Sequence, residues 1–153
     1  MKGITKFTPS LTSINSNYGI VYTSWNEEIV SSLLENTKKE LLSLGVNENN
    51  ISVVEIPGAF EIPLASKSLA SSVDAVIALG AIIKGDTPHF DFIASSCAQG
   101  IVQVSLEEKK PIIFGVLTTN NEEQALERSD ANRENKGAEF ARSAMQMIEA
   151  LSS

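Results

Sequence analysis

Short apolar runs alternate with longer segments of helical periodicity along almost the whole chain, and this alternation limits the fold more than any other feature. Strands are predicted at residues 20–23, 51–56, 75–83 and 111–117. Helices are predicted after residue 24, from about 63 towards 71, over about 90–108, and from 122 to 151 with an interruption at 132–135. A repeating strand–helix order builds a parallel sheet with helices on both faces, so we expect an α/β fold.

Local signals set the expected ends of these elements. Ser24, with Glu27 three residues later, matches the pattern of a capping box at the start of the first long helix. Gly45 stands where that helix is expected to stop, and Pro63 suits the first turn of the next helix. Residues 75–83 are apolar throughout, which is typical of a central parallel strand covered on both faces.

The N-terminal residues fit nowhere in the strand–helix repeat. Ile4, Phe7, Leu11 and Ile14 are too few for a helix, and Pro9 opposes one. Two alternatives remain open: a free tail, or a strand that pairs with another subunit. No linker or repeat divides the chain, so residues 1–153 are expected to form a single domain with residues 1–15 as an N-terminal arm.

Composition narrows the range of partners and compartments. A net charge of −7 argues against binding to nucleic acid or to an anionic membrane. The chain has no apolar run near the roughly 20 residues that a membrane helix needs, and its start lacks the apolar core of a signal peptide. The expected location is therefore the cytoplasm. The single cysteine, Cys97, is expected to be a small buried side chain in a packed helix.

The chemistry is expected at the carboxyl ends of the strands, where open parallel sheets bind their ligands. The segments that follow the four strands begin at Ser24, at Gly58, at Lys84 and at Thr118. The only tryptophan of the chain, Trp25, and its only histidine, His89, both lie on this edge. This coincidence is the strongest indication of a site that the residues themselves provide.

Each of these residues has both a structural and a functional interpretation. Trp25 either anchors the first helix at the surface or forms a platform for a flat heterocycle. Glu61 either begins a helix or accepts hydrogen bonds from the hydroxyls of a polyol. His89 is either structural or an acid–base group that works near neutral pH. One histidine, a distant cysteine and scattered carboxylates have no metal-ligand spacing, so no metal site is expected.

Residues 80–87, GAIIKGDT, differ by one residue from the phosphate-binding loop pattern G-x-x-x-x-G-K-[ST]. Asp86 occupies the position of the lysine, which argues against hydrolysis of a nucleoside triphosphate. The end of the segment remains suited to phosphate, because Gly85 permits close approach of the backbone, Thr87 has a hydroxyl, and a helix N-terminus follows. No G-x-G-x-x-G motif follows a strand, which disfavours a dinucleotide cofactor.

Five strings along the chain resemble segments of the lumazine synthase family, in the same order and spacing: PGAFEIP, LGAIIKGDTPHFD, IIFGVLTT, EQALER and NKGAE. The resemblance extends from Gly19 to the last helix. It implies a three-layer, flavodoxin-like α/β/α fold with a four-stranded parallel sheet of order 2-1-3-4. It also implies a transferase of riboflavin biosynthesis, a 6,7-dimethyl-8-ribityllumazine synthase. Such an enzyme condenses 5-amino-6-(D-ribitylamino)uracil with 3,4-dihydroxy-2-butanone 4-phosphate, and it needs no cofactor or metal.

The resemblance also implies a role for individual positions. Trp25 is expected to stack on the pyrimidine ring, and His89 to transfer protons. The remaining positions expected to bind the ribitylaminouracil are Asn26, Ala59, Phe60, Glu61, Ile82, Ile83, Phe114 and Lys136. The positions expected to bind phosphate are Gly85, Asp86, Thr87 and Arg128.

The resemblance further implies a homo-oligomer, because the family forms its active sites between subunits of a pentamer, and Phe114 matches a residue supplied by the neighbour. The resemblance also allows a second protein partner, riboflavin synthase. Two departures from the family pattern stand out. The Asp86 carboxylate must point away from a phosphate. The stretch SDANREN at residues 129–135 lacks the glycines of relatives that form sixty-subunit shells, so we expect a free pentamer.

Two other functions compete with the synthase. A non-catalytic carrier of flavin or pteridine would need Trp25 and Glu61 but no phosphate site. A structural shell protein with a vestigial pocket would need neither. The joint presence of Thr87, His89, Arg128 and Lys136 favours the synthase.

Overall fold

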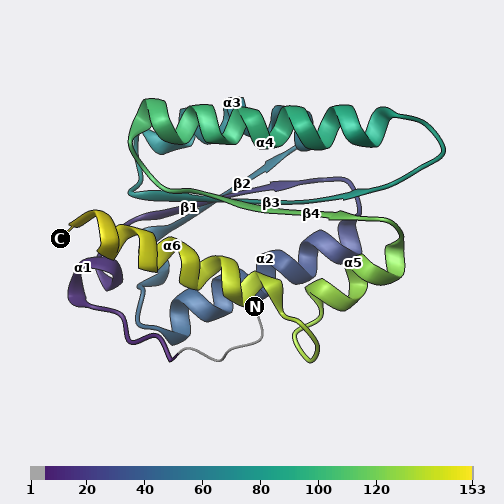
Figure 1. Ribbon diagram of the computed structural model, residues 1–153. Coiled ribbons are helices and arrows are strands. Elements are labelled where there is room, and N and C mark those ends of the chain that lie inside the picture. Colours follow the sequence, from purple (N-terminus) through teal and green to yellow (C-terminus); the bar gives the residue numbers. More distant parts are fainter. Residues whose placement is uncertain (1–5, 153) are drawn as a thin grey trace.

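The computed structural model describes residues 6–152 and has three layers (Figure 1). Four parallel strands form one sheet in the order β2-β1-β3-β4. Helices α3 and α4 cover one face, while α2, α5 and α6 cover the other. The expected α/β class and the strand order 2-1-3-4 are both confirmed.

The strands are β1 (Tyr18–Thr23), β2 (Ile51–Ile56), β3 (Ala75–Ile83) and β4 (Ile112–Thr119). The α-helices are α1 (Leu11–Ile14), α2 (Glu27–Ser43), α3 (Ile62–Ala70), α4 (His89–Glu108), α5 (Glu122–Ser129) and α6 (Lys136–Ser152). Two 3-10 turns, η1 (Glu48–Asn50) and η2 (Ala59–Glu61), precede β2 and α3.

Most of the predicted boundaries agree with the structure to within two residues. The fourth strand, β4, extends two residues beyond its predicted end, to Thr119. Thr118 and Thr119 pair with Ile82 and Ile83 of β3. The apolar run that predicted this strand ends at Leu117. The two threonines that follow are polar but β-branched, and β-branched residues continue a strand readily. The longer β4 brings its end level with the end of β3, at the edge where the site was expected.

The predicted capping box at the start of α2 is wrong. The N-cap residue is Asn26, whose backbone is left-handed (φ 58°, ψ 51°), and its side chain makes no capping hydrogen bond. The hydroxyl of Ser24 donates instead to a carboxylate oxygen of Glu55 and lies 3.1 Å from the carbonyl oxygen of Ile56, both on β2. The spacing of Ser24 and Glu27 therefore reflects the strand-end turn and not a helix cap.

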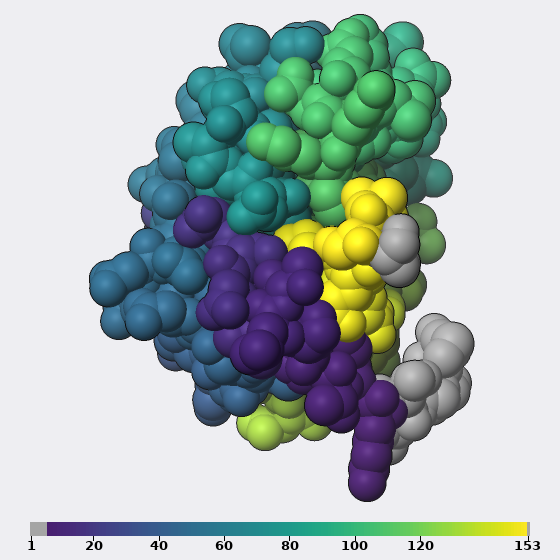
Figure 2. All heavy atoms as spheres, turned by 90° about the vertical axis from the view of Figure 1, so that its left-hand side faces the viewer, coloured from purple at the N-terminus to yellow at the C-terminus, as the bar shows by residue number. Residues whose placement is uncertain are grey.

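The expectation that the N-terminal residues form no helix is also wrong, because α1 is one short helical turn. The hydroxyl of Ser13, a buried residue of this turn, donates to the carboxylate of Glu149 on α6. The backbone N–H of Ser10 donates to the same carboxylate at 2.7 Å, and Phe7 packs against the core. Figure 2 shows this purple segment beside the yellow end of α6. Residues from Phe7 onward are thus attached to their own chain, while Ile4 lies outside the described residues.

Two apolar cores flank the sheet. Side chains of α2 and α6, among them Leu33 and Met145, pack on one face. Side chains of α3 and α4, among them Ile62 and Cys97, pack on the other. Cys97 is fully buried, as expected.

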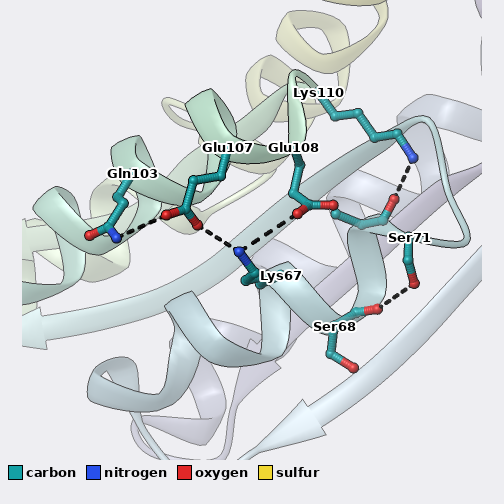
Figure 3. A network of polar contacts seen from close by, with 8 residues as sticks. Lys67, Ser68, Ser71, Gln103, Glu107, Glu108 and Lys110 are labelled. Atoms are coloured by element: carbon teal, nitrogen blue, oxygen red, sulfur yellow. Dashed lines mark hydrogen bonds and ion pairs between the residues drawn. The ribbon is translucent and has the colours of Figure 1, made fainter.

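Polar contacts join α3 to α4 along their exposed sides (Figure 3). Lys67 on α3 forms an ion pair with Glu107 on α4 at 2.7 Å, and Gln103 donates to the same carboxylate. Lys110 donates to the carbonyl oxygen of Ala70 at the end of α3. These contacts tie the layer that carries His89 into one unit. Among the described helices, none is both long and apolar enough to span a membrane.

Candidate active site

A cavity of about 450 Å³ opens at the carboxyl ends of the strands. The end of β1, the turn after β2, the end of β3 and the first turns of α4 form its wall. The lining residues are Thr23, Trp25, Asn26, Gly58, Ala59, Phe60, Glu61, Ala81, Ile82, Ile83, His89 and Ile93. The only tryptophan and the only histidine of the chain therefore share one cavity.

Volume alone does not select this site. A cavity of about 580 Å³ lies between α2 and α5, and one of about 380 Å³ lies among residues 105–113 and the end of α6. Neither contains an aromatic platform or a histidine. The cavity at the strand ends is the one of these three that combines an aromatic side chain, a carboxylate and an imidazole with an apolar floor.

Trp25 and Glu61 come close to each other above Gly58. A Cβ atom added to Gly58 would lie 3.3 Å from Oε1 of Glu61 and 3.5 Å from Cδ1 of Trp25. Trp25 is 72% exposed, so its side chain is open to a ligand. A flat ring stacked on Trp25 would thus have a hydrogen-bond acceptor, the carboxylate of Glu61, near its margin.

His89 is the first residue of α4 and lines the cavity. The residue is exposed, so its imidazole can exchange protons with water as well as with a ligand. Ile93, one turn later, faces the same cavity because residues four apart share a face of a helix. The N-terminus of this 20-residue helix also favours a bound anion.

The predicted phosphate-binding loop lies next to the cavity but does not line it. Gly85, Asp86 and Thr87 are exposed in the connection between β3 and α4. A Cβ atom added to Gly85 would meet no atom within 4 Å, so the backbone there is open to an incoming group.

Three further predicted residues lie away from this cavity in the same chain. Phe114 is in β4, where it pairs with Ala78 and is 38% exposed. Arg128 lies in the last turn of α5 and donates to the carbonyl oxygen of Gln124, while Lys136 begins α6 and forms an ion pair with Glu139 at 2.8 Å. Both helices lie on the sheet face opposite α4 (Figure 1).

Several cavity residues were missed by reading the sequence: Thr23, Ala81 and Ile93. Two of them had a usable signal, because Thr23 ends a predicted strand and Ile93 lies one helical turn after His89. Ala81 lies within an apolar run and had none.

The cysteine of the chain, Cys97, does not line this cavity. Burial raises the pKa of the Cys97 thiol from 9.0 to about 11, which makes this thiol a poor nucleophile. Residues 6–152 contain no group of three histidine, cysteine or acidic side chains that could hold a metal ion.

Comparisons with known proteins point in one direction. The family model described as 6,7-dimethyl-8-ribityllumazine synthase matches residues 15–152. The chain is also 50% identical over 133 residues to the 6,7-dimethyl-8-ribityllumazine synthase of Protochlamydia amoebophila (strain UWE25), and this similarity covers 86% of the chain and 77% of that protein.

Proposed function

The chain belongs to the 6,7-dimethyl-8-ribityllumazine synthase family, and from this premise we propose that its strand-end cavity is the synthase active site. The reaction condenses 5-amino-6-(D-ribitylamino)uracil with 3,4-dihydroxy-2-butanone 4-phosphate and releases phosphate and water. The observation that carries the assignment is the meeting of Trp25, Glu61 and His89 in one cavity. The protein is accordingly an enzyme of riboflavin biosynthesis.

The ribitylaminouracil occupies the part of the cavity between Trp25 and the end of β3. Its ring stacks on the exposed indole, which favours a flat heterocycle beyond the area buried. Ile82 and Ile83 bring backbone groups to the ring, and the ribityl hydroxyls run towards Ala59, Phe60 and Glu61. The carboxylate of Glu61 suits a polyol because it only accepts hydrogen bonds.

His89 moves protons between the amine, the ketone and water. It lines the cavity and is exposed to solvent, and an imidazole can both accept and donate a proton. Acid–base help of this kind contributes about 10²–10⁴-fold, whereas holding two reactants together can contribute roughly 7–11 kcal/mol. Positioning of the two substrates therefore supplies the larger part of the rate, and His89 the smaller.

The phosphate of the ketose binds beside the N-terminus of α4. Gly85 offers an open backbone, Thr87 a hydroxyl, and the helix terminus a favourable field. The carboxylate of Asp86 turns away, so that only the backbone of this residue faces the anion. Arg128 completes the phosphate site with a planar, bidentate donor.

A neighbouring copy of the chain supplies the residues that one chain keeps away from its own cavity. Phe114 on β4, Arg128 on α5 and Lys136 on α6 belong to that group. A head-to-tail contact that repeats around a closed ring makes every site equivalent, and this suits a pentamer. The lack of glycine at residues 129–135 favours a free pentamer over a sixty-subunit shell. Light scattering decides: a mass near five chains supports the pentamer, and a mass near sixty chains overturns it.

Turnover is the direct test of the activity. The purified protein is incubated with both substrates while product absorbance and released phosphate are measured together. We expect one phosphate for each lumazine formed. Binding of the uracil without any product would overturn the synthase assignment and support a carrier.

A mixed oligomer tests whether the sites are shared. His89→Ala and Phe114→Ala subunits are each prepared, dissociated and assembled together. If each site draws on two chains, the mixture contains some sites with neither substitution and regains activity that both parent variants lack. No regain in a mixture shown to contain both subunits would contradict the role of Phe114.

A further inference from the structure

Trp25 lies between two residues that are tied to different strands. On one side, the backbone N–H of Ser24 donates to the carbonyl oxygen of Ile56 on β2 at 2.9 Å. On the other side, Nδ2 of Asn26 donates to the carbonyl oxygen of Ala81 on β3, also at 2.9 Å. Trp25 is 72% exposed, so packing of neighbouring side chains against its indole contributes little to its position. Its orientation depends mainly on the backbone of residues 24–26.

The hydrogen bond from Asn26 takes the place of a backbone hydrogen bond that β1 does not make to the end of β3. The last residue pair between β1 and β3 is Tyr22 with Leu79, and β1 ends at Thr23. Ala81 is two residues beyond that pair, in a part of β3 that β1 no longer accompanies. The side-chain amide of Asn26 satisfies a carbonyl group that would otherwise lose its strand partner, and an unsatisfied carbonyl there would be costly.

The backbone of Asn26 meets a second requirement at the same point. Its φ of 58° is left-handed, a conformation that asparagine tolerates better than most residues do. Its carbonyl oxygen accepts the hydrogen bond from Val30 that opens α2. Asn26 therefore forms the turn after Trp25, begins α2 and links both to β3.

We propose that Asn26 is a positioning residue, which holds Trp25 as a platform over the cavity through its bond to Ala81. One N–H of its side-chain amide is engaged by Ala81 within the protein, and through this bond Asn26 acts on the substrate by way of Trp25 and the backbone. The part of this proposal that concerns substrate rests on the proposed function, whereas the part that concerns Trp25 does not.

Asn26→Gly removes the side-chain bond while tolerating the left-handed backbone, although glycine also adds freedom to that backbone. Asn26→Asp, a second variant, keeps a similar size but sets an acceptor against the Ala81 carbonyl. Glu27→Gln, on the exposed neighbour, is the control for a change at the start of α2. The lone tryptophan makes its fluorescence a readout of the site in the ligand-free protein.

Time-resolved anisotropy and acrylamide quenching are measured without ligand, and the KM of each substrate afterwards. We expect both Asn26 variants to show a larger fast anisotropy component and faster quenching, while Glu27→Gln matches the parent protein. Loss of one hydrogen bond predicts a KM for the ribitylaminouracil raised about 2- to 12-fold, with the KM of the ketose phosphate nearly unchanged.

Unchanged anisotropy and quenching in both Asn26 variants would overturn the positioning role, even if uracil binding weakened, because Asn26 would then be a direct ligand. If Trp25 becomes mobile while uracil binding is unaffected, the positioning role stands. That second result would instead contradict the stacking of substrate on Trp25 in the proposed function.

Discussion

The contact between α2 and α6 has almost no room at Gly137, and we predict that Gly137→Ala destabilises the protein. A Cβ atom at this position would lie 2.7 Å from the carbonyl oxygen of Leu33 and 3.0 Å from Cβ of Asn36. The nearer atom belongs to the backbone of α2, so no rotation of a side chain relieves the overlap. The two helices must separate by several tenths of an ångström.

The magnitude follows from three contributions. Forcing an extra methyl group into a packed interior costs about 1–3 kcal/mol. Separation also weakens the bond from the buried hydroxyl of Thr37 to the Gly137 carbonyl, now 2.9 Å, which is worth about 0.5–1.5 kcal/mol. Alanine recovers about 0.5–1 kcal/mol relative to glycine within a helix. The central values of these contributions combine to a net destabilisation of about 2 kcal/mol, which corresponds to a Tm lower by roughly 4–8 °C.

The assay is thermal unfolding followed by circular dichroism at one protein concentration, because association of the proposed kind would also contribute to stability. Gly85→Ala is the matched control, because its added Cβ meets nothing within 4 Å and its Tm should change by no more than about 1–2 °C. A Tm for Gly137→Ala equal to or above that of the parent protein would refute the close approach of α2 and α6.

Three further outcomes are expected. In the native protein at pH 8, Cys97 should react with a thiol reagent at least about 100-fold more slowly than after unfolding, because burial raises its pKa to about 11; rapid native labelling would contradict this. Hydrogen bonds from Ser13 and Ser10 lower the pKa of Glu149, so their stabilisation is complete above the unfolded pKa and is lost as pH falls through the lower folded value. The backbone amides of residues 10–15 should then lose protection from hydrogen exchange in acid in the parent protein but not in Glu149→Gln. The same dependence of exchange on pH in both proteins would refute the role of Glu149. His89→Ala should lower kcat by about 10²–10³-fold with little change in KM, and an unchanged kcat would remove His89 from proton transfer.

The sequence was most informative where one pattern had one physical cause. The apolar run of residues 75–83 is β3 with its predicted bounds, since a central parallel strand is covered on both faces. The strand-end rule placed Trp25 and His89 on one edge, and the cavity there contains both.

Prediction was weakest where tertiary contacts override a local motif. Ser24 and Glu27 have the spacing of a capping box, but β2 captures the Ser24 hydroxyl and leaves Asn26 to begin α2. The short helix α1 is bound through Ser13 by Glu149, which lies 136 residues away in the sequence. Neither partner is visible in the local sequence. The separation of Phe114, Arg128 and Lys136 from the cavity is likewise a property of the folded chain.

A structure of the protein with bound 6,7-dimethyl-8-ribityllumazine tests the central claim most directly. We predict that the lumazine ring stacks on Trp25, the ribityl chain extends towards Glu61, and Phe114 of a neighbouring copy closes the cavity. A product bound away from Trp25 and His89, for example in the cavity between Leu106 and Met147, would contradict the assignment of the active site.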